Sequence, residues 1–211
     1  MVFKQDQVAT WISIQITRVS NTQFTIADSG GTSNWVYKLS KGTILRWLQS
    51  GSPMVAVVSN AVYLSNVVTV TLFGDILASG YTNMSYTNEN VIIDRFPYNG
   101  NISSEFADVM KVFYYPIQVR ILAVELNCTA GAGGSGSTTI DVKVQGVTIL
   151  PTKLVLSNIA TNVLVGTNNN IVAVNNKVTL DITTILTAPT TYHSDAEVVV
   201  YAIPYRYLFL P

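Results

Sequence analysis

Short segments in which apolar and polar residues alternate recur along this chain, and they constrain its fold more than any other feature. Residues 139–145 are the clearest case, because Ile140 and Val142 alternate with polar neighbours. A period of two places one face of a β-strand in a core and the other toward solvent. The same alternation recurs at residues 12–17 and 177–182. The pattern therefore predicts an all-β protein.

Residues 115–150 are the stretch around which we expect the second half of the chain to be organised. One arm, residues 116–126, alternates in the same way as the other arm, residues 139–145. Between them lie residues 131–137, which read Gly-Ala-Gly-Gly-Ser-Gly-Ser. Because glycine restricts the backbone very little, we expect two neighbouring strands joined by a mobile tip.

Turn-forming residues punctuate the first part of the chain about every ten residues, which is the spacing of an all-β domain. The predicted strands there are residues 12–16, 23–27, 35–39, 43–48, 54–59 and 67–73. Such a series predicts a small antiparallel β-barrel or sandwich domain over residues 1–80.

The remaining chain predicts a linker and a second domain. Residues 80–90 are polar, aromatic and unpatterned, and we expect a linker over residues 81–111 with a possible short helix at residues 103–111. About eight strands then predict a jelly-roll β-sandwich over residues 112–211. Within it, residues 162–165 and 171–174 are expected as strands, with the Gly-Thr-Asn-Asn-Asn segment at 166–170 as the loop between them.

Composition narrows the classes of function. Charged residues make up 11% of the 211 residues, against about 25% in a typical globular chain. Uncharged polar surface suits burial against partner subunits or the exterior of a particle, although a sandwich with threonine-rich outer faces has the same composition. The net charge is zero and no basic patch occurs, so we expect no binding of nucleic acid through phosphate neutralisation.

Cysteine content and hydropathy set further limits. The single cysteine, Cys128, leaves no partner for an intrachain disulfide or a thiolate zinc site. No run of about 20 apolar residues is present, so we expect no membrane span. The first residues do not read as a signal peptide, and we expect folding in a cytoplasm.

His193 is the obvious residue to test for catalysis, since Asp195 and Glu197 follow it closely. A Ser-His-Asp triad on a nucleophile elbow would need a G-x-S-x-G motif, which the sequence lacks. We therefore expect a loop histidine. A divalent cation near Asp195 and Glu197 is the alternative, although two carboxylates are few for a hard cation.

Other candidate sites have equally plain structural interpretations. Residues 131–137 lack the lysine of a phosphate-binding loop. Asp141 and Asp181 occupy polar positions of alternating strands, where we expect a solvated strand face. The largest aromatic residues could form a sugar-stacking platform or could simply pack, and these are Trp11, Trp35, Trp47, Tyr201, Tyr205 and Tyr207. We predict no catalytic residue, no metal site and no cofactor.

Four segments of the first half carry a family resemblance. They read ITRVSNTQFTI at residues 16–26, LSKG at 39–42, VAVVSNA at 55–61 and VVTVT at 67–71. This order resembles a small β-domain that recurs in virion proteins of tailed bacteriophages. The resemblance covers roughly residues 8–80.

The second half resembles a jelly-roll domain of the same class of virion proteins. The matching segments read YP at residues 115–116, GGSGSTTIDV at 133–142, QGVTIL at 145–150 and KVTLDI at 177–182. The chain departs from the pattern at Gln145, where the turn usually has Asn, and at Asn176 and Lys177, where Gly-Asp is usual.

These resemblances imply a non-enzymatic structural protein of a virion that is assembled in the host cytoplasm. The expected form is a homotrimer that decorates or cements the capsid surface and binds the major capsid protein. The alternative is a tail, baseplate or fibre component that contacts host glycans, with residues 166–170 among the contacts. An enzyme such as a depolymerase would need paired carboxylates in a groove, and no local pattern supplies them.

Overall fold

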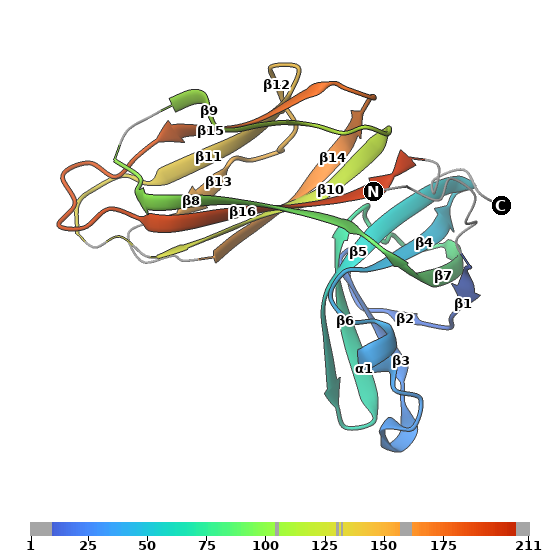
Figure 1. The fold of residues 1–211 in the computed structure, drawn as a ribbon. Helices are drawn as coiled ribbons and strands as arrows, with labels where there is room; N and C mark the ends of the chain where they lie inside the picture. The colour runs from blue at the N-terminus through green and yellow to red at the C-terminus, as the bar shows by residue number, and fades with distance from the viewer. Residues whose placement is uncertain (1–9, 104–105, 130, 132, 157–161, 206–211) are drawn as a thin grey trace. The chain divides into compact units, whose positions relative to one another are not determined.

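The structure is a computed structural model that describes residues 10–103, 106–129, 131, 133–156 and 162–205. It divides into two compact units, which are described separately here (Figure 1). Unit 1 extends to Val91, and unit 2 covers Ile92–Tyr205. The boundary lies inside the segment 81–111 that the sequence predicts as a linker. Among the described residues, no helix has the length and hydropathy needed to span a membrane.

Unit 1 is built on one antiparallel sheet of seven strands, sheet A, in the order β1-β7-β4-β5-β6-β3-β2. The strands are β1 (Ile12–Ser13), β2 (Thr17–Arg18), β3 (Gln23–Ala27), β4 (Thr43–Gln49), β5 (Ser52–Leu64), β6 (Val67–Gly74) and β7 (Tyr81–Asn90). β5 is 13 residues long, and its register with β6 shifts between Val58 and Asn60. Such a bulge bends a strand, which helps the sheet to curl.

Tight hairpins connect the central strands of sheet A. Ser50 and Gly51 form the turn between β4 and β5, and Ser65 and Asn66 form the turn between β5 and β6. All four residues have positive φ. This is the geometry of a type I′ turn, whose twist matches the twist of the strands on either side.

The curled sheet encloses the core of unit 1. Phe24 of β3, Trp47 of β4 and Leu72 of β6 belong to this core and are buried. Burying a side chain of this size stabilises the fold by roughly 1.5–3 kcal/mol relative to leaving it exposed. The alternation read in residues 23–27 and 67–73 is therefore confirmed.

Residues 35–39, predicted as a strand, instead form the short helix α1 (Trp35–Lys38), and this prediction is wrong. The Asp28 carboxylate accepts hydrogen bonds from the backbone N–H groups of Ser33 and Trp35. The N–H of Leu39 donates to the carbonyl oxygen of Trp35 and completes the turn. A carboxylate earlier in the chain thus decides the conformation, and local alternation does not report it.

The expectation of a linker is also wrong for residues 81–90, because they form β7, which lies between β1 and β4 in sheet A. Met84 and Tyr86 are buried in the core, and Ser85 and Thr87 are buried as well. Since polar residues occupy buried positions on the opposite face of the strand, the usual contrast between the two faces is lost.

Unit 2 consists of two antiparallel sheets. Sheet B has the order β14-β10-β16-β8, with strands β8 (Ile92–Asn101), β10 (Val119–Thr129), β14 (Asn162–Val172) and β16 (Ser194–Pro204). Sheet C has the order β12-β11-β15-β9, with strands β9 (Phe106–Tyr114), β11 (Thr138–Val144), β12 (Val147–Thr148) and β15 (Lys177–Thr184). β13 (Leu154–Leu156) also pairs with β11.

The order of connections makes unit 2 a jelly roll. The chain alternates between the two sheets. It passes from β8 in sheet B to β9 in sheet C, from β10 in sheet B to β11 in sheet C, and from β14 in sheet B to β15 in sheet C, before it ends with β16 in sheet B. The last strand, β16, inserts between β8 and β10. This crossing between two sheets is the jelly-roll arrangement, so the predicted fold class is confirmed.

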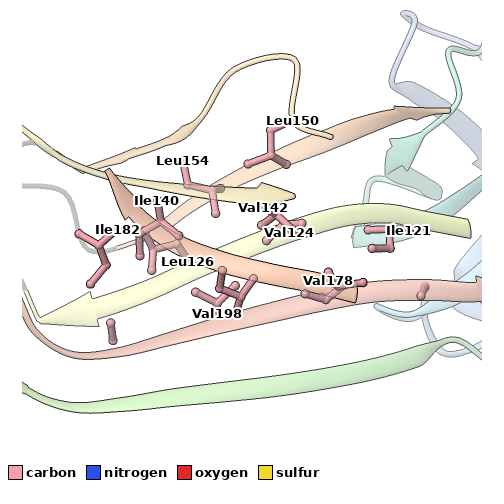
Figure 2. Packing of buried hydrophobic residues seen from close by; sticks show 14 of the residues in the cluster. Ile121, Val124, Leu126, Ile140, Val142, Leu150, Leu154, Val178, Ile182 and Val198 are labelled. Atoms are coloured by element: carbon pink, nitrogen blue, oxygen red, sulfur yellow. The ribbon is translucent and has the colours of Figure 1, made fainter. Parts of the chain in front are cut away.

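β10 and β11, predicted as neighbouring strands, lie in opposite sheets, and that prediction is wrong. β10 pairs with β14 and β16, whereas β11 pairs with β13 and β15. Figure 2 shows Val124 and Leu126 of β10 in the same core as Ile140 and Val142 of β11. Alternation identifies a strand and its buried face, but it does not identify the strand's partner.

Two further expectations in unit 2 are overturned. Within residues 103–111, expected as a short helix, the described part from Phe106 onward belongs to β9, which pairs with β15. Residues 166–170, expected as a loop, lie inside β14, where the register against β10 shifts between Ile121 and Ala123. A bulge absorbs the extra residues of this polar segment without ending the strand.

Candidate functional site

The structure has an open pocket in unit 1, which we call the loop pocket. Its volume is about 230 Å³. It lies where the loop between β3 and α1 meets α1 and the end of β5. Its lining residues are Asp28, Gly31, Asn34, Val36, Tyr37 and Tyr63.

Asp28 organises the loop side of this pocket. Its Oδ1 accepts a hydrogen bond from the Ser33 N–H at 2.9 Å, and its Oδ2 accepts one from the Trp35 N–H at 3.3 Å. The N–H of Gly31 donates to the carbonyl oxygen of Asp28 at 3.1 Å. Gly31 has a φ of 69° and closes a turn that few other residues would tolerate. The short 3-10 turn at Ser29–Gly31 results.

Asn66 fixes the strand side of the pocket to this loop. Its Oδ1 accepts hydrogen bonds from the Gly30 N–H and from the Tyr63 hydroxyl, both at 3.0 Å. Its carbonyl oxygen accepts from the Asp28 N–H at 2.8 Å. Asn66 occupies the second position of the β5–β6 turn, where asparagine tolerates positive φ. One residue therefore sets both the hairpin turn and the pocket wall.

An acidic residue, Asp28, lines the pocket, and its side chain is buried. Asp28 is only 2% exposed. Within the part of the chain that the structure describes, it has no ion-pair partner. The nearby Lys38 ammonium lies over the Trp35 ring, 4.7 Å from its centroid. The carboxylate is thus stabilised by backbone N–H groups and not by a cation.

Exposed apolar residues line the pocket at Tyr37 and Tyr63 and flank Tyr63 along β5. Tyr37 is 80% exposed, and Val62, Tyr63 and Leu64 at the end of β5 are exposed as well. We call residues 62–64 the hairpin tip. Apolar residues gathered at a pocket are typical of an interaction surface.

His193 lies in the interior of unit 2 and links two of its segments. It is fully buried, and its Nδ1 lies 2.8 Å from the Thr138 Oγ1. Its carbonyl oxygen accepts a hydrogen bond from the Ile102 N–H. The ring therefore connects the loop before β16 to the start of β11.

Asp195 and Glu197, considered for a cation, have separate partners. Asp195 Oδ1 accepts from the Gly100 N–H at 3.2 Å, and Glu197 Oε2 lies 2.8 Å from Arg95 Nη1. Across the described residues, no group of three His, Cys, Asp or Glu side chains is placed to hold a metal ion.

The glycine-rich segment 131–137, predicted as a mobile tip, is packed closely at Gly131 and Gly134, although residues 133–136 are exposed. A Cβ at Gly134 would lie 2.6 Å from the Thr187 carbonyl oxygen, and one at Gly131 would lie 2.6 Å from Leu186 Cδ1. Ser135 and Thr187 exchange backbone hydrogen bonds of 3.0 and 2.8 Å. The glycines are needed for close approach to the loop that precedes β16, so the expectation of a free tip is wrong.

Asp141 and Asp181, predicted on a solvated face, are both buried, and this prediction is wrong as well. They do lie on the face of sheet C away from the core. There, Lys143 Nζ lies 2.5 Å from Asp181 Oδ2, and the Thr148 hydroxyl donates to Asp141 Oδ1 at 2.5 Å. Neighbouring polar side chains therefore take the place of solvent.

The three tryptophans do not form a sugar-stacking platform. Trp47 is buried in the core of unit 1. Trp35 packs edge-on against Tyr86, with 6.2 Å between ring centroids. Arg46 Cζ lies 4.2 Å from the centroid of the Trp11 ring.

The tyrosines of the predicted platform serve unit 2. The Tyr201 hydroxyl donates to Glu125 Oε2 at 2.5 Å, and both residues are buried. The Tyr205 N–H donates to the carbonyl oxygen of Gln118. Tyr207 lies outside the described residues.

Sequence reasoning did not single out the residues of the loop pocket. The segment at residues 28–31 was recognisable as a loop, but the expected strand at 35–39 removed Tyr37 from consideration. Tyr63 stood in no predicted strand. The one available signal was a carboxylate, Asp28, followed by two glycines close to an Asn-Trp pair.

No protein-family profile matches the chain, and no curated protein matches it. Among solved structures, it is similar to dimeric latent PorU from Porphyromonas gingivalis, with 9% identity and a TM-score of 0.29. The match covers 93% of this chain and 24% of that chain, so the chain spans about a quarter of that protein's length. The fold defines this chain as an all-β protein in which a jelly roll follows a unit with a curled sheet.

Proposed function

We propose that this chain is a non-enzymatic structural protein of a bacteriophage virion, a homotrimer that decorates or cements the capsid surface. The sequence resemblances of both halves support this function. The jelly roll of unit 2 supports it as well, because this architecture is common in capsid domains. The partner would be the major capsid protein.

The observation that carries the proposal is the distribution of apolar residues over the outer face of sheet C. At one edge, Val112 and Tyr114 of β9 are exposed. At the other edge, Val155 of β13 is exposed. Val112 pairs with Thr179 and Val155 pairs with Thr139, which places both valines on the face away from the core.

Apolar edges at opposite ends of one sheet suit an interface between different patches of identical copies. The β9 edge of one copy would pack against the β12–β13 edge of the next. Such head-to-tail contacts generate a closed ring when the rotation between copies closes. A ring of three copies would be the proposed homotrimer.

Unit 1 offers the surface for the capsid. The loop pocket and the hairpin tip are exposed, and they present few charges. Many symmetric copies on one shell would gain affinity through avidity, so each contact can be weak. Function then depends on burial of surface, and the protein makes or breaks no bond.

A tail, baseplate or fibre component that contacts host glycans is the second candidate. The exposed Tyr37 ring beside the Asn34 amide is the observation that favours it, because tyrosine rings and amides are common in sugar sites. Binding of the purified protein to a glycan array, with a Tyr37→Ala variant as control, separates the two functions.

The direct test is the position of the protein in the particle. Purified virions would be labelled with an antibody against this chain and reconstructed by electron cryo-microscopy. We expect label and three-fold jelly-roll density on the capsid surface. Label confined to the tail would favour the second candidate, and absence of the chain from virions would overturn both.

A further inference from the structure

We propose that the loop pocket binds a cationic side chain, the ammonium of a lysine or the guanidinium of an arginine, presented by a partner protein. The inference deepens the proposed function and rests on it for the origin of the partner, a protein of the particle. The binding chemistry itself rests on the pocket alone.

The Asp28 carboxylate of the pocket favours a ligand of opposite charge. Asp28 is 2% exposed and lines the pocket, and its carboxylate accepts two backbone N–H groups. A carboxylate can accept about four hydrogen bonds, so part of its capacity remains. No cation within the described chain pairs with it. A buried charge without an opposite charge is unfavourable, and a cationic ligand would remove that cost.

The tyrosine rings that line the pocket also favour a cation. Tyr37 and Tyr63 both line the pocket and come from different elements, α1 and β5. Cations bind over tyrosine faces through the ring quadrupole. The Tyr63 hydroxyl donates to Asn66 Oδ1, which restrains its ring. Tyr37, 80% exposed, has room to fold over a ligand.

The volume of the pocket favours a single side chain as the ligand. The pocket volume of about 230 Å³ is below the roughly 300–1,000 Å³ of sites for whole small molecules. It suits one long side chain.

Other ligand classes fit less well. Phosphate or carboxylate ligands would be repelled by Asp28. A neutral sugar would leave the Asp28 charge without an opposite charge, and the Tyr63 hydroxyl already donates to Asn66. The ligand is therefore a single basic side chain of the partner protein.

The test is a titration of the full-length, ¹⁵N-labelled protein monitored by NMR. The cationic probes are N-acetyl-lysine methylamide and N-acetyl-arginine methylamide. N-acetyl-norleucine methylamide is the neutral control, and methyl α-glucoside represents sugars. We expect the cationic probes to shift the amide signals of Gly30, Gly31 and Asn34 at millimolar concentration. The shifts should weaken when salt is raised, because salt screens the attraction.

Two substitutions locate the site. Tyr37→Ala removes an exposed ring and should weaken binding at least fivefold without affecting folding. Asp28→Asn should weaken it at least tenfold, with thermal unfolding checked in parallel because the loop depends on this carboxylate. Val174→Ala, at an exposed residue of unit 2 outside the proposed subunit contact, is the control and should leave binding unchanged.

Each outcome bears on the inference. Equal shifts with the norleucine probe, binding of methyl α-glucoside in place of the cations, or full binding by Tyr37→Ala would overturn it. If the cationic probes bind but the chain is absent from virions, the pocket chemistry stands and the proposed function fails. If the chain decorates capsids but no cation binds, only the inference about the pocket fails.

Discussion

Asp141 on β11 and Asp181 on β15 lie directly opposite each other in sheet C, and both carboxylates are buried on the face away from the core. Like charges at opposed positions of a sheet destabilise it. Here Lys143 lies 2.5 Å from Asp181, and the Thr148 hydroxyl donates to Asp141. The outer face of the jelly roll therefore holds an ionic network between its two apolar edges.

Lys143→Met should destabilise unit 2 strongly. The substitution leaves the Asp181 carboxylate, with 0% of its side chain exposed, without its lysine. Removing one partner of a buried pair costs about 3–5 kcal/mol. Urea unfolding monitored by circular dichroism measures the change.

Arg95→Met is the matched control, because the Arg95–Glu197 pair is exposed and similar in length. Exposed pairs contribute about 0–1 kcal/mol. Equal unfolding midpoints for the two variants would show that the network around Asp181 does not carry this stability.

Gly134→Ala should lower the free energy of unfolding by at least about 2 kcal/mol, since the new Cβ meets backbone atoms of a neighbouring loop. Its Cβ would lie 2.6 Å from the Thr187 carbonyl oxygen. Gly80→Ala provides the comparison, because Gly80 has φ +79°, close to the +76° of Gly134, and no atom within 4 Å of the added Cβ. It should cost only about 1 kcal/mol, the strain of positive φ. Thermal melts that rank the two variants equally would contradict close packing at Gly134.

Gln145→Asn should stabilise the β11–β12 hairpin. Gln145 has φ 50° and Gly146 has φ 80°, as a type I′ turn requires, and asparagine adopts this conformation more easily than glutamine. The exposed hydrogen bond from Gln145 Nε2 to Asn176 would be lost. We expect a net gain of about 0.5 kcal/mol, measured by chemical unfolding. A lower stability than that of the natural chain would mean that the side-chain hydrogen bond outweighs the turn preference.

The Cys128 thiol should be unreactive and should make the fold sensitive to alkali. Burial raises its pKa from 9.0 to about 11. The unfolded chain therefore loses this proton first, and stability falls as pH rises from 9 to 11. Below pH 9 the contribution is fully present.

Tyr115 should also lower the stability of the fold as pH rises, because its pKa is raised in the folded protein. Burial and the neighbouring Asp94 carboxylate raise its pKa above the usual value. Unfolding measured from pH 8 to pH 11 should show a shallower decline in Cys128→Ala than in the natural chain. Modification by a disulfide reagent at pH 8 should be slow in the folded protein and fast in urea. An unchanged slope together with rapid modification would show that the thiol is accessible.

Period-two alternation predicted the strands whose polar face meets solvent or few neighbours, such as β3 and β6. It failed where both faces are buried, as in β7, because Ser85 and Thr87 are enclosed and the contrast is lost. It also failed where a distant hydrogen bond decides the backbone, as Asp28 does for α1. The jelly-roll class followed from strand number and resemblance, but strand partners did not.

The candidate site was even less visible in the sequence. The loop pocket brings together residues from a loop, a helix and a hairpin that are separated along the chain. No motif spacing marks such a set. The burial of Asp141 and Asp181 was equally hidden, because it depends on Lys143 and Thr148 being folded onto them.

The apolar edges of sheet C should be needed for assembly. Val155→Asp places a charge on the β13 edge, where the valine is exposed in the single chain. It should leave the fold intact and dissociate the trimer, because a charge at the centre of an apolar contact is costly. Val174→Asp is a control at an exposed valine outside the strands of sheet C, and it should assemble normally. Circular dichroism confirms folding of both.

The most direct measurement is the mass of the purified protein in solution by sedimentation equilibrium. Three copies of the 23.0 kDa chain are expected in the natural protein and in Val174→Asp, and one copy in Val155→Asp. A natural protein that sediments as a single 23.0 kDa chain at micromolar concentration would contradict the proposed trimer and the structural role that depends on it.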